Sequence, residues 1–296
     1  MKLEPECIGC LFHQMLRAFK IVKPDISSDI ILTAQKKLMK YLLEIDINKS
    51  SAPIVGKFLY NLVAKMLEIE DPYHSLKDKY NRLALSYYDE AKKIINDAED
   101  PLFEALAISS IGNTVDFASQ HNIDLINDLK NFSSDKFKIN HYPYFKKSIE
   151  RIYQNNGFIL ILGDNAGEIV FDKLLIEKMQ KIYPNLNIIY TVRAAPVIND
   201  ATMEDAKFVN LTKIVKVIEA SPVPGIDLAS ATEEFKQYFY ENNGIILSKG
   251  QGNFETLYGL ETPNKEIYYL LKAKCSLMER IFNVKIGDLI FKKKES

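Results

Sequence analysis

The sequence predicts an α/β protein in which a helical first half precedes a second half built on a mainly parallel β-sheet. Only three of the twelve glycines precede residue 150, whereas nine follow it. Helix interiors avoid glycine, while strand–loop–helix units use it at their turns. A length of 296 residues favours two domains. We therefore expect one domain over residues 1–150 and a second over residues 151–296.

The first half contains apolar residues that recur at the spacing of a helix. The stripes begin at Ile30, where Ser27 and Ser28 are available as caps, at Pro53, at Tyr80 and at Pro101. They extend to residues 45, 66, 94 and 111, the last one stopping at Gly112. Such stripes are typical of core packing between helices.

The second half alternates between short apolar runs and helix-like segments. The runs cover residues 158–162, 187–192, 214–218, 244–248 and 267–271, and helix-like segments cover 168–183 and 227–243. This alternation predicts a parallel, doubly wound sheet. Ligands bind such sheets at the carboxyl ends of the strands, so we expect the functional loops after residues 162, 192, 218 and 248.

Composition excludes several classes of protein. The net charge is −1, which argues against the basic surface that nucleic-acid binding requires. No apolar run reaches the roughly 18 residues of a membrane span, and the acidic N-terminal segment does not resemble a signal peptide. Three cysteines do not make a disulfide framework, so we expect a reducing, cytoplasmic setting. There is no GxSxG, Walker or HExxH motif, and a dinucleotide cofactor is not indicated.

The loop after the first apolar run carries oxygen donors. Asp164 and Asn165 follow the run directly and precede a helix. Carboxylate and amide oxygens suit hard divalent cations, and a helix N-terminus suits phosphate. Taken alone, the same residues also fit an ordinary cap and turn.

Two further loops favour a site over a simple turn. Residues 193–202 bring Arg193 and Asp200 to the same edge of the expected sheet, and residues 248–253 place Lys249 in a glycine-rich turn. Arginine suits a phosphate or carboxylate as a fork of donors, and Gly250 lets the backbone approach a ligand closely. Three polar loops at one edge predict a metal-dependent site for a phosphate ester.

In this arrangement the chain resembles the metal-dependent damage-control phosphatases, formerly domain of unknown function 89, which include the acidic-residue methyltransferase-like proteins. The resemblance covers nearly the whole chain. Its CxxC pattern is typical of a subgroup of the family found in archaea and bacteria. It implies a helical N-terminal region joined to a Rossmann-like α/β/α domain with a mainly parallel sheet. The matching segments are Cys7–Cys10, 112–116, 163–168, 196–202, 248–253 and 272–275.

The resemblance also implies roles for particular residues. It implies a divalent cation (Mn²⁺, Mg²⁺, Co²⁺ or Ni²⁺) held by Asp164, Asn165 and Asp200. The catalytic candidates are Asp164, Asp116 and Glu168. The substrate-binding candidates are Asn113, Arg193, Lys249, Gly250 and Asn253. The cation would act as a Lewis acid, while Asp116 or Glu168 orients water or protonates the leaving group; an aspartyl-phosphate on Asp164 is a second possible route.

These observations predict a phosphatase that acts on phosphate monoesters of small metabolites, such as sugar phosphates or damaged phosphometabolites. The alternatives are a carboxyl methyltransferase, for which no glycine-rich cofactor loop is evident, and a non-catalytic protein that binds sugar phosphates with a metal. We expect no nucleic-acid or membrane partner, and the oligomeric state is left open. Cys7 and Cys10 are interpreted as packing thiols, with a zinc site or a redox pair as the alternatives.

Overall fold

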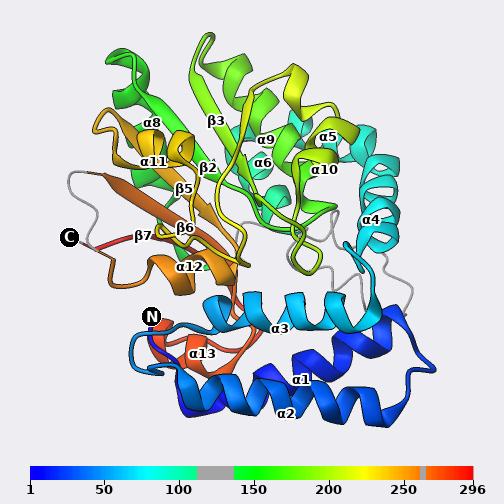
Figure 1. Cartoon of the computed structure of the whole chain (residues 1–296). Helices are drawn as coiled ribbons and strands as arrows, with labels where there is room; N and C mark the ends of the chain where they lie inside the picture. Colours follow the sequence, from blue (N-terminus) through cyan, green and yellow to red (C-terminus); the bar gives the residue numbers. More distant parts are fainter. Residues whose placement is uncertain (112–136, 261–264, 296) are drawn as a thin grey trace.

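The protein is a layered α/β structure with an additional group of helices at one end (Figure 1). A computed structural model describes residues 1–111, 137–260 and 265–295. The expected α/β class and the mainly parallel sheet are confirmed. Within these ranges no helix is both long enough and apolar enough to cross a lipid bilayer.

A seven-stranded sheet forms the centre of the α/β part, in the order β1-β7-β6-β5-β2-β3-β4. All neighbouring strands are parallel except β6 and β7, which pair antiparallel. The chain runs from β2 outward through β3 and β4, and then returns to β5 on the other side of β2. This reversal places a topological switch point at the carboxyl ends of β2 and β5. The strands are β1 (Phe137–Asn140), β2 (Phe158–Leu162), β3 (Asn187–Val192), β4 (Lys216–Glu219), β5 (Gly244–Lys249), β6 (Glu266–Lys272) and β7 (Leu289–Lys293).

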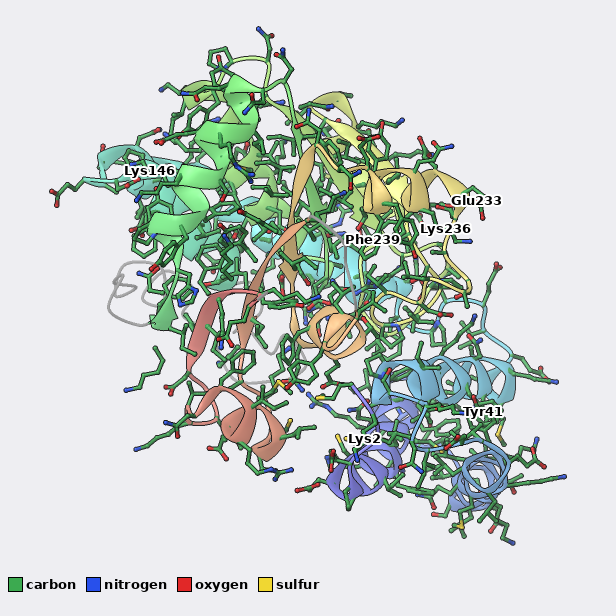
Figure 2. The ribbon with its side chains drawn as sticks, turned by 90° about the vertical axis from the view of Figure 1, so that its left-hand side faces the viewer. Lys2, Tyr41, Lys146, Glu233, Lys236 and Phe239 are labelled. Carbon is green, nitrogen blue, oxygen red and sulfur yellow. The ribbon has the colours of Figure 1, made fainter. Side chains whose placement is uncertain are left out.

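Both faces of the sheet are buried, so its central strand β2 is apolar throughout. In β2, Ile159 and Ile161 pack into one core, while Leu160 and Leu162 pack into the other. Figure 2 shows α8, which carries Lys146, and α11, which carries Phe239, on opposite sides of the sheet. The first face is covered by α5 (Tyr88–Asp97), α6 (Pro101–Ile111), α8 (Tyr142–Gln154), α9 (Glu168–Ile182) and α10 (Met203–Phe208). The second is covered by α11 (Glu233–Tyr240), α12 (Gln251–Leu257) and α13 (Ser276–Phe282).

The first three helices form a separate layer with its own core. They are α1 (Pro5–Val22), α2 (Ser28–Glu44) and α3 (Ala52–Leu67). The helices expected from Ile30 and Pro53 are thus confirmed as α2 and α3. Helix α1 was not expected, although Leu11, Met15 and Phe19 form a buried stripe at four-residue spacing.

The stripe expected as one helix from Tyr80 to Ile94 is two helices, α4 (His74–Ser86) and α5. The helix stops at Tyr87, whose backbone lies at φ −102° and ψ 0°. The Ser86 hydroxyl donates to the Leu83 carbonyl at 2.6 Å, and such local bonds compete with the helical ladder. The run at 214–218 begins later than expected, since a 3₁₀ turn, η2 (Leu211–Lys213), precedes β4.

The expected division at residue 150 falls inside α8, and β1 already belongs to the sheet. Helices α4 and α6 of the first half pack against α9 of the second. The two-domain division therefore stays a prediction. Within the described ranges, the layer α1–α3 is the part of the first half with a core distinct from those of the sheet.

Candidate active site

The loops that follow β2 and β3 are joined by backbone hydrogen bonds at the carboxyl edge of the sheet. Asn165 and Asp200 form an isolated antiparallel bridge. The Ala166 N–H donates to the Asn199 carbonyl, and the Ala201 N–H donates to the Asp164 carbonyl, each at 2.8 Å. This pairing holds the two expected acidic loops side by side, although they lie far apart in the sequence.

Three oxygen-bearing side chains meet where these loops pair. The Asn165 amide nitrogen donates to Asp164 Oδ2 at 3.1 Å and to Glu168 Oε1 at 3.2 Å. Because both donors of this amide are used, its oxygen is left for another partner. Asp164 and Asp200 are only 8% and 4% exposed. Burial raises the pKa of Asp200 to about 7, with Asp164 adding to the rise and Arg193 opposing it.

Arg193 links the two acids from beneath. Its Nε donates to Asp200 Oδ2 at 2.5 Å, and one Nη lies 3.5 Å from Asp164 Oδ1. The other Nη donates to the Gly225 carbonyl and to Asn253 Oδ1, each at 2.9 Å. The Arg193 guanidinium therefore partly neutralises and orients the two carboxylates.

Lys249 sits in a second, fully buried ion network on the other side of Asn165. Its ammonium donates to the Ser109 carbonyl at 2.8 Å, to Glu168 Oε2 at 3.0 Å and to Asp172. Tyr190 donates to the remaining Asp172 oxygen at 2.7 Å. Burial raises the pKa of Glu168 to about 7, although Lys249 opposes that rise. Burial also lowers the pKa of Lys249, but its two acids outweigh this effect and leave the pKa raised.

Gly250 is required by the position of Asp164. A Cβ at Gly250 would lie 1.9 Å from Asp164 Oδ2, and the backbone adopts φ +78°. Gly252 is equally restricted, since a Cβ there would lie 2.2 Å from the Pro224 carbonyl. The glycine-rich turn thus makes room for an acidic side chain and for a neighbouring loop.

A cavity of about 440 Å³ lies between this edge of the sheet and the helical layer. From the sheet side it is lined by the three oxygen-bearing residues Asp164, Asn165 and Asp200. From the helical side it is lined by residues of α1 and α3, among them Cys7, Cys10, His13, Gln14, Arg17 and Tyr60. Asn113 and Asp116, the residues expected from the helical half, lie outside the described residues.

Comparison with known proteins identifies the family. A family model for the damage-control phosphatase ARMT1-like domain matches residues 3–290. The chain belongs to this family. It is 31% identical to a damage-control phosphatase of Archaeoglobus fulgidus over 99% of each chain, and 32% identical to one of Pyrococcus horikoshii over 98% of this chain and 97% of that one. The crystal structure of a DUF89 family protein from P. horikoshii superposes with a TM-score of 0.87 at 30% identity, with complete coverage of both chains.

The candidate site is suited to the divalent cation that this family suggests. Asp164 and Asp200 provide carboxylate oxygens and Asn165 an amide oxygen, a donor set typical of Mg²⁺ or Mn²⁺. Gly250 leaves space for the Asp164 carboxylate that any Cβ would remove. Across residues 1–111, 137–260 and 265–295, no three His, Cys, Asp or Glu side chains form a metal cluster, so the candidate set depends on the amide of Asn165.

The structure also shows where the remaining candidates lie. Glu168, Arg193, Lys249 and Asn253 are buried beneath the cavity and bonded to protein groups. Asn253 uses both ends of its amide, because Oδ1 accepts from Arg193 and Nδ2 donates to the Lys249 carbonyl at 2.7 Å. Their roles toward substrate stay predictions.

Two contributors to the site were not expected from the sequence. Asn81 of α4 accepts from the Gly167 N–H at 2.7 Å and donates to Asp205 at 2.8 Å. Asp205 in turn closes a capping box with Thr202 at the start of α10. One helix thus holds both acidic loops, and one N–H at the start of α9 is already bonded to protein.

The three cysteines all line the same cavity as free thiols. Cys7 is half-buried and packs against the second core, and burial raises the pKa of its thiol. Cys10 is exposed and accepts from the Gln14 amide at 3.1 Å. The interpretation as a packing thiol therefore fits Cys7. It does not fit Cys10, which is exposed on the cavity wall.

Proposed function

We propose that this protein is a metal-dependent phosphatase that hydrolyses phosphate monoesters of small metabolites in the cavity between the sheet and the helical layer. The observation that carries the proposal is the convergence of Asp164, Asn165 and Asp200 on that cavity. Membership of the damage-control phosphatase family supports the same activity. Sugar phosphates or damaged phosphometabolites are the proposed substrates, and free thiols support a cytoplasmic setting.

Asp164, Asn165 and Asp200 would hold the cation, for which Mn²⁺, Mg²⁺, Co²⁺ and Ni²⁺ are the candidates. When bound, it supplies Lewis-acid polarisation of a phosphoryl oxygen. Arg193 would hold the two carboxylates in place through its bonds to both. Glu168 and Lys249 hold the Asn165 amide in one orientation, so that its oxygen stays available.

Glu168 and Asp116 are the candidates that would orient water or protonate the leaving group. Glu168 is fully buried and bonded on both oxygens, which favours a positioning role. Asp116 is the proposed acid–base residue, on the basis of the family resemblance alone. Two routes remain: direct attack by water, and an aspartyl-phosphate intermediate on Asp164. Acid quenching during turnover distinguishes them, because only the second route leaves phosphate bound to the protein.

The decisive experiment measures phosphate release from a panel of small phosphate monoesters with each divalent cation in turn. Asp200→Asn keeps an acceptor for Arg193 and removes one charge, so the fold should persist. We expect the metal-dependent rate to fall by about 10²-fold or more.

Asp227→Asn is the matched control. Asp227 lies in the loop after β4, the neighbour of β3, and its carboxylate accepts from the Ala229 N–H and the Ser230 hydroxyl of its own turn. It should keep wild-type activity. A non-catalytic binding protein would instead be stabilised by a sugar phosphate and release no phosphate in any combination, and that result would refute the proposal.

A further inference from the structure

The three cysteines lie in one region, where the helical layer meets the carboxyl edge of the sheet. Cys7 belongs to the first turn of α1, Cys10 follows one turn later, and Cys275 is the N-cap of α13. All three are free thiols that line the cavity. The thiols therefore stand on both walls of the cavity, and the proposed hydrolysis uses none of them.

The start of α1 is tied to α13, next to Cys7 and Cys275. Helix α13 lies beside α1 (Figure 1), and Arg280 donates to the carboxylate of Glu6 at 2.7 Å. Cys7 and Cys275 are both half-buried, and both pack against the second core of the sheet. Cys7 also packs against the core of the helical layer, so it lies where the two parts of the molecule meet.

A second set of contacts connects Cys275 to Cys7 through α12. The Gln251 amide nitrogen donates to the Cys275 sulfur at 3.4 Å and to Glu255 at 2.7 Å. The Gln251 amide oxygen accepts the Lys274 N–H at 3.1 Å, which fixes the orientation of the amide. Burial raises the pKa of the Cys7 thiol, and the nearby charges of Glu255 and Cys275 add to the rise. Cys7, Glu255 and Cys275 thus form one cluster.

Thiols on opposite walls could hold a metal or form a disulfide, and the structure favours the disulfide. Within the described ranges, no three His, Cys, Asp or Glu side chains form a metal cluster, whereas a structural zinc site needs four ligands. Cys7 and Cys10 share a helix, where Cβ atoms three residues apart are about 5–6 Å from each other, but a disulfide needs about 3.5–4.5 Å. Bridging that pair would distort α1. Cys275 precedes α13 with extended backbone, at φ −153° and ψ 165°, so helical geometry does not restrict it.

We propose that Cys7 and Cys275 form a reversible disulfide, which joins the helical layer to the sheet and restricts opening of the cavity. The oxidant is a low-molecular-weight disulfide. Cys275 attacks first, because the raised pKa of Cys7 lowers its thiolate fraction.

The reaction is two successive thiol–disulfide exchanges. The Cys275 thiolate bonds to one sulfur of the oxidant, whose S–S bond breaks and releases a small thiolate. The Cys7 thiolate then bonds to the Cys275 sulfur and displaces the second small thiolate. The protein gives up two electrons and two protons, and the oxidant becomes two small thiols.

The crosslink affects the cavity because α1 forms part of its wall. The layer α1–α3 has a core distinct from those of the sheet, so the two parts can shift relative to each other without repacking either core. In the reduced protein, the ion pair between Glu6 and Arg280 is half-exposed, and such pairs are weak. A covalent bond beside it should slow the entry of substrate and the release of product. This effect on turnover rests on the proposed function, whereas formation of the disulfide does not.

The test treats the full chain with oxidised glutathione and then with dithiothreitol, in the wild type, Cys7→Ser, Cys275→Ser and the control Cys10→Ser. Peptide mapping identifies the disulfide, and thermal unfolding and phosphate release measure its effects. In the wild type and Cys10→Ser, we expect a Cys7–Cys275 bond and a higher unfolding temperature, because the bond closes a long loop. Phosphate release should fall by at least about fivefold, the lower end of ordinary couplings, and dithiothreitol should restore it. Cys7→Ser and Cys275→Ser should show no rise in unfolding temperature.

Three outcomes would overturn the crosslink: no disulfide in the oxidised wild type, a Cys7–Cys10 bond as the main product, or the same rise in unfolding temperature in Cys275→Ser. Cys7→Ala is made beside Cys7→Ser, so that loss of core packing by the hydroxyl is not mistaken for loss of the bond. If the bond forms but phosphate release is unchanged, the control of the cavity fails and the phosphatase activity stands. If neither redox state releases phosphate, the proposed function fails and the crosslink stands.

Discussion

Replacing Gly250 with alanine tests whether the position of Asp164 determines activity. The new Cβ would lie 1.9 Å from Asp164 Oδ2, whereas ordinary contact begins near 3.4 Å. The carboxylate must therefore move by about 1.5 Å, or the turn must open by a similar amount. Displacements of about 1 Å in a catalytic group cost roughly 10²-fold in rate. We expect a loss of at least that size, together with weaker binding of the divalent cation.

The substitution also strains the backbone, and a control separates that effect. Gly250 adopts φ +78°, which costs a residue with a Cβ about 1–3 kcal/mol. Gly259 adopts φ +75°, but a Cβ there would meet nothing within 4 Å. Gly259→Ala should therefore lose stability through its backbone and keep full activity, while Gly250→Ala loses both.

The assays are thermal unfolding, cation affinity by calorimetry, and phosphate release at saturating cation. Wild-type cation affinity and rate in Gly250→Ala would refute the reasoning, because Asp164 would then tolerate displacement. Equal losses of activity in the two alanine variants would show that global stability, and not the Asp164 contact, governs the rate.

Two further predictions follow from the buried groups. Burial raises the pKa of Asp200 to about 7 in the cation-free protein, and since the ionised carboxylate is the ligand, cation binding should release protons and tighten by about tenfold from pH 6 to pH 8. Calorimetry in buffers of different ionisation enthalpy counts those protons, and an affinity independent of pH would contradict the assignment. The double variant Cys7→Ser/Cys10→Ser should keep cation-dependent activity and lose only stability, because Cys7 packs against the core. Elemental analysis checks this, since a zinc equivalent lost from the variant would show that the thiols hold a metal.

Much of the fold follows from local patterns in the sequence. β2 is apolar throughout, and β3 and β5 are mostly apolar, because both faces of the sheet are covered. Their loops carry polar residues because the carboxyl ends meet the cavity. The pattern does not specify where a helix is interrupted, as at Tyr87, next to the bond that Ser86 donates to the Leu83 carbonyl. The short strands β1 and β7 were missed as well; β1 pairs with β7, which lies far away in the sequence.

The site shows the same division between local and long-range information. That Asp164, Asn165 and Asp200 lie close together could be predicted because they belong to the loops that follow β2 and β3. The sequence also contained a signal for the buried ion network. Glu168 and Asp172 are four residues apart on a helix, where like charges repel unless a cation lies between them, as Lys249 does. The rule about carboxyl ends applies equally to the run at 267–271, and extending it there would have pointed to Lys274, whose side chain also lines the cavity.

The two walls of the cavity differ in how their polar side chains are bonded. Beneath the cavity, Arg193, Lys249 and Asn253 are bonded to protein, so the geometry of the acids is set before any ligand arrives. Across the cavity, the wall comes from α1 and α3, where Tyr60 donates to Gln14 at 2.8 Å. That layer has its own core and can vary without disturbing the sheet. Selection among phosphorylated metabolites should therefore depend on the face of α1 and α3, while the phosphoryl group is handled at the carboxyl edge of the sheet.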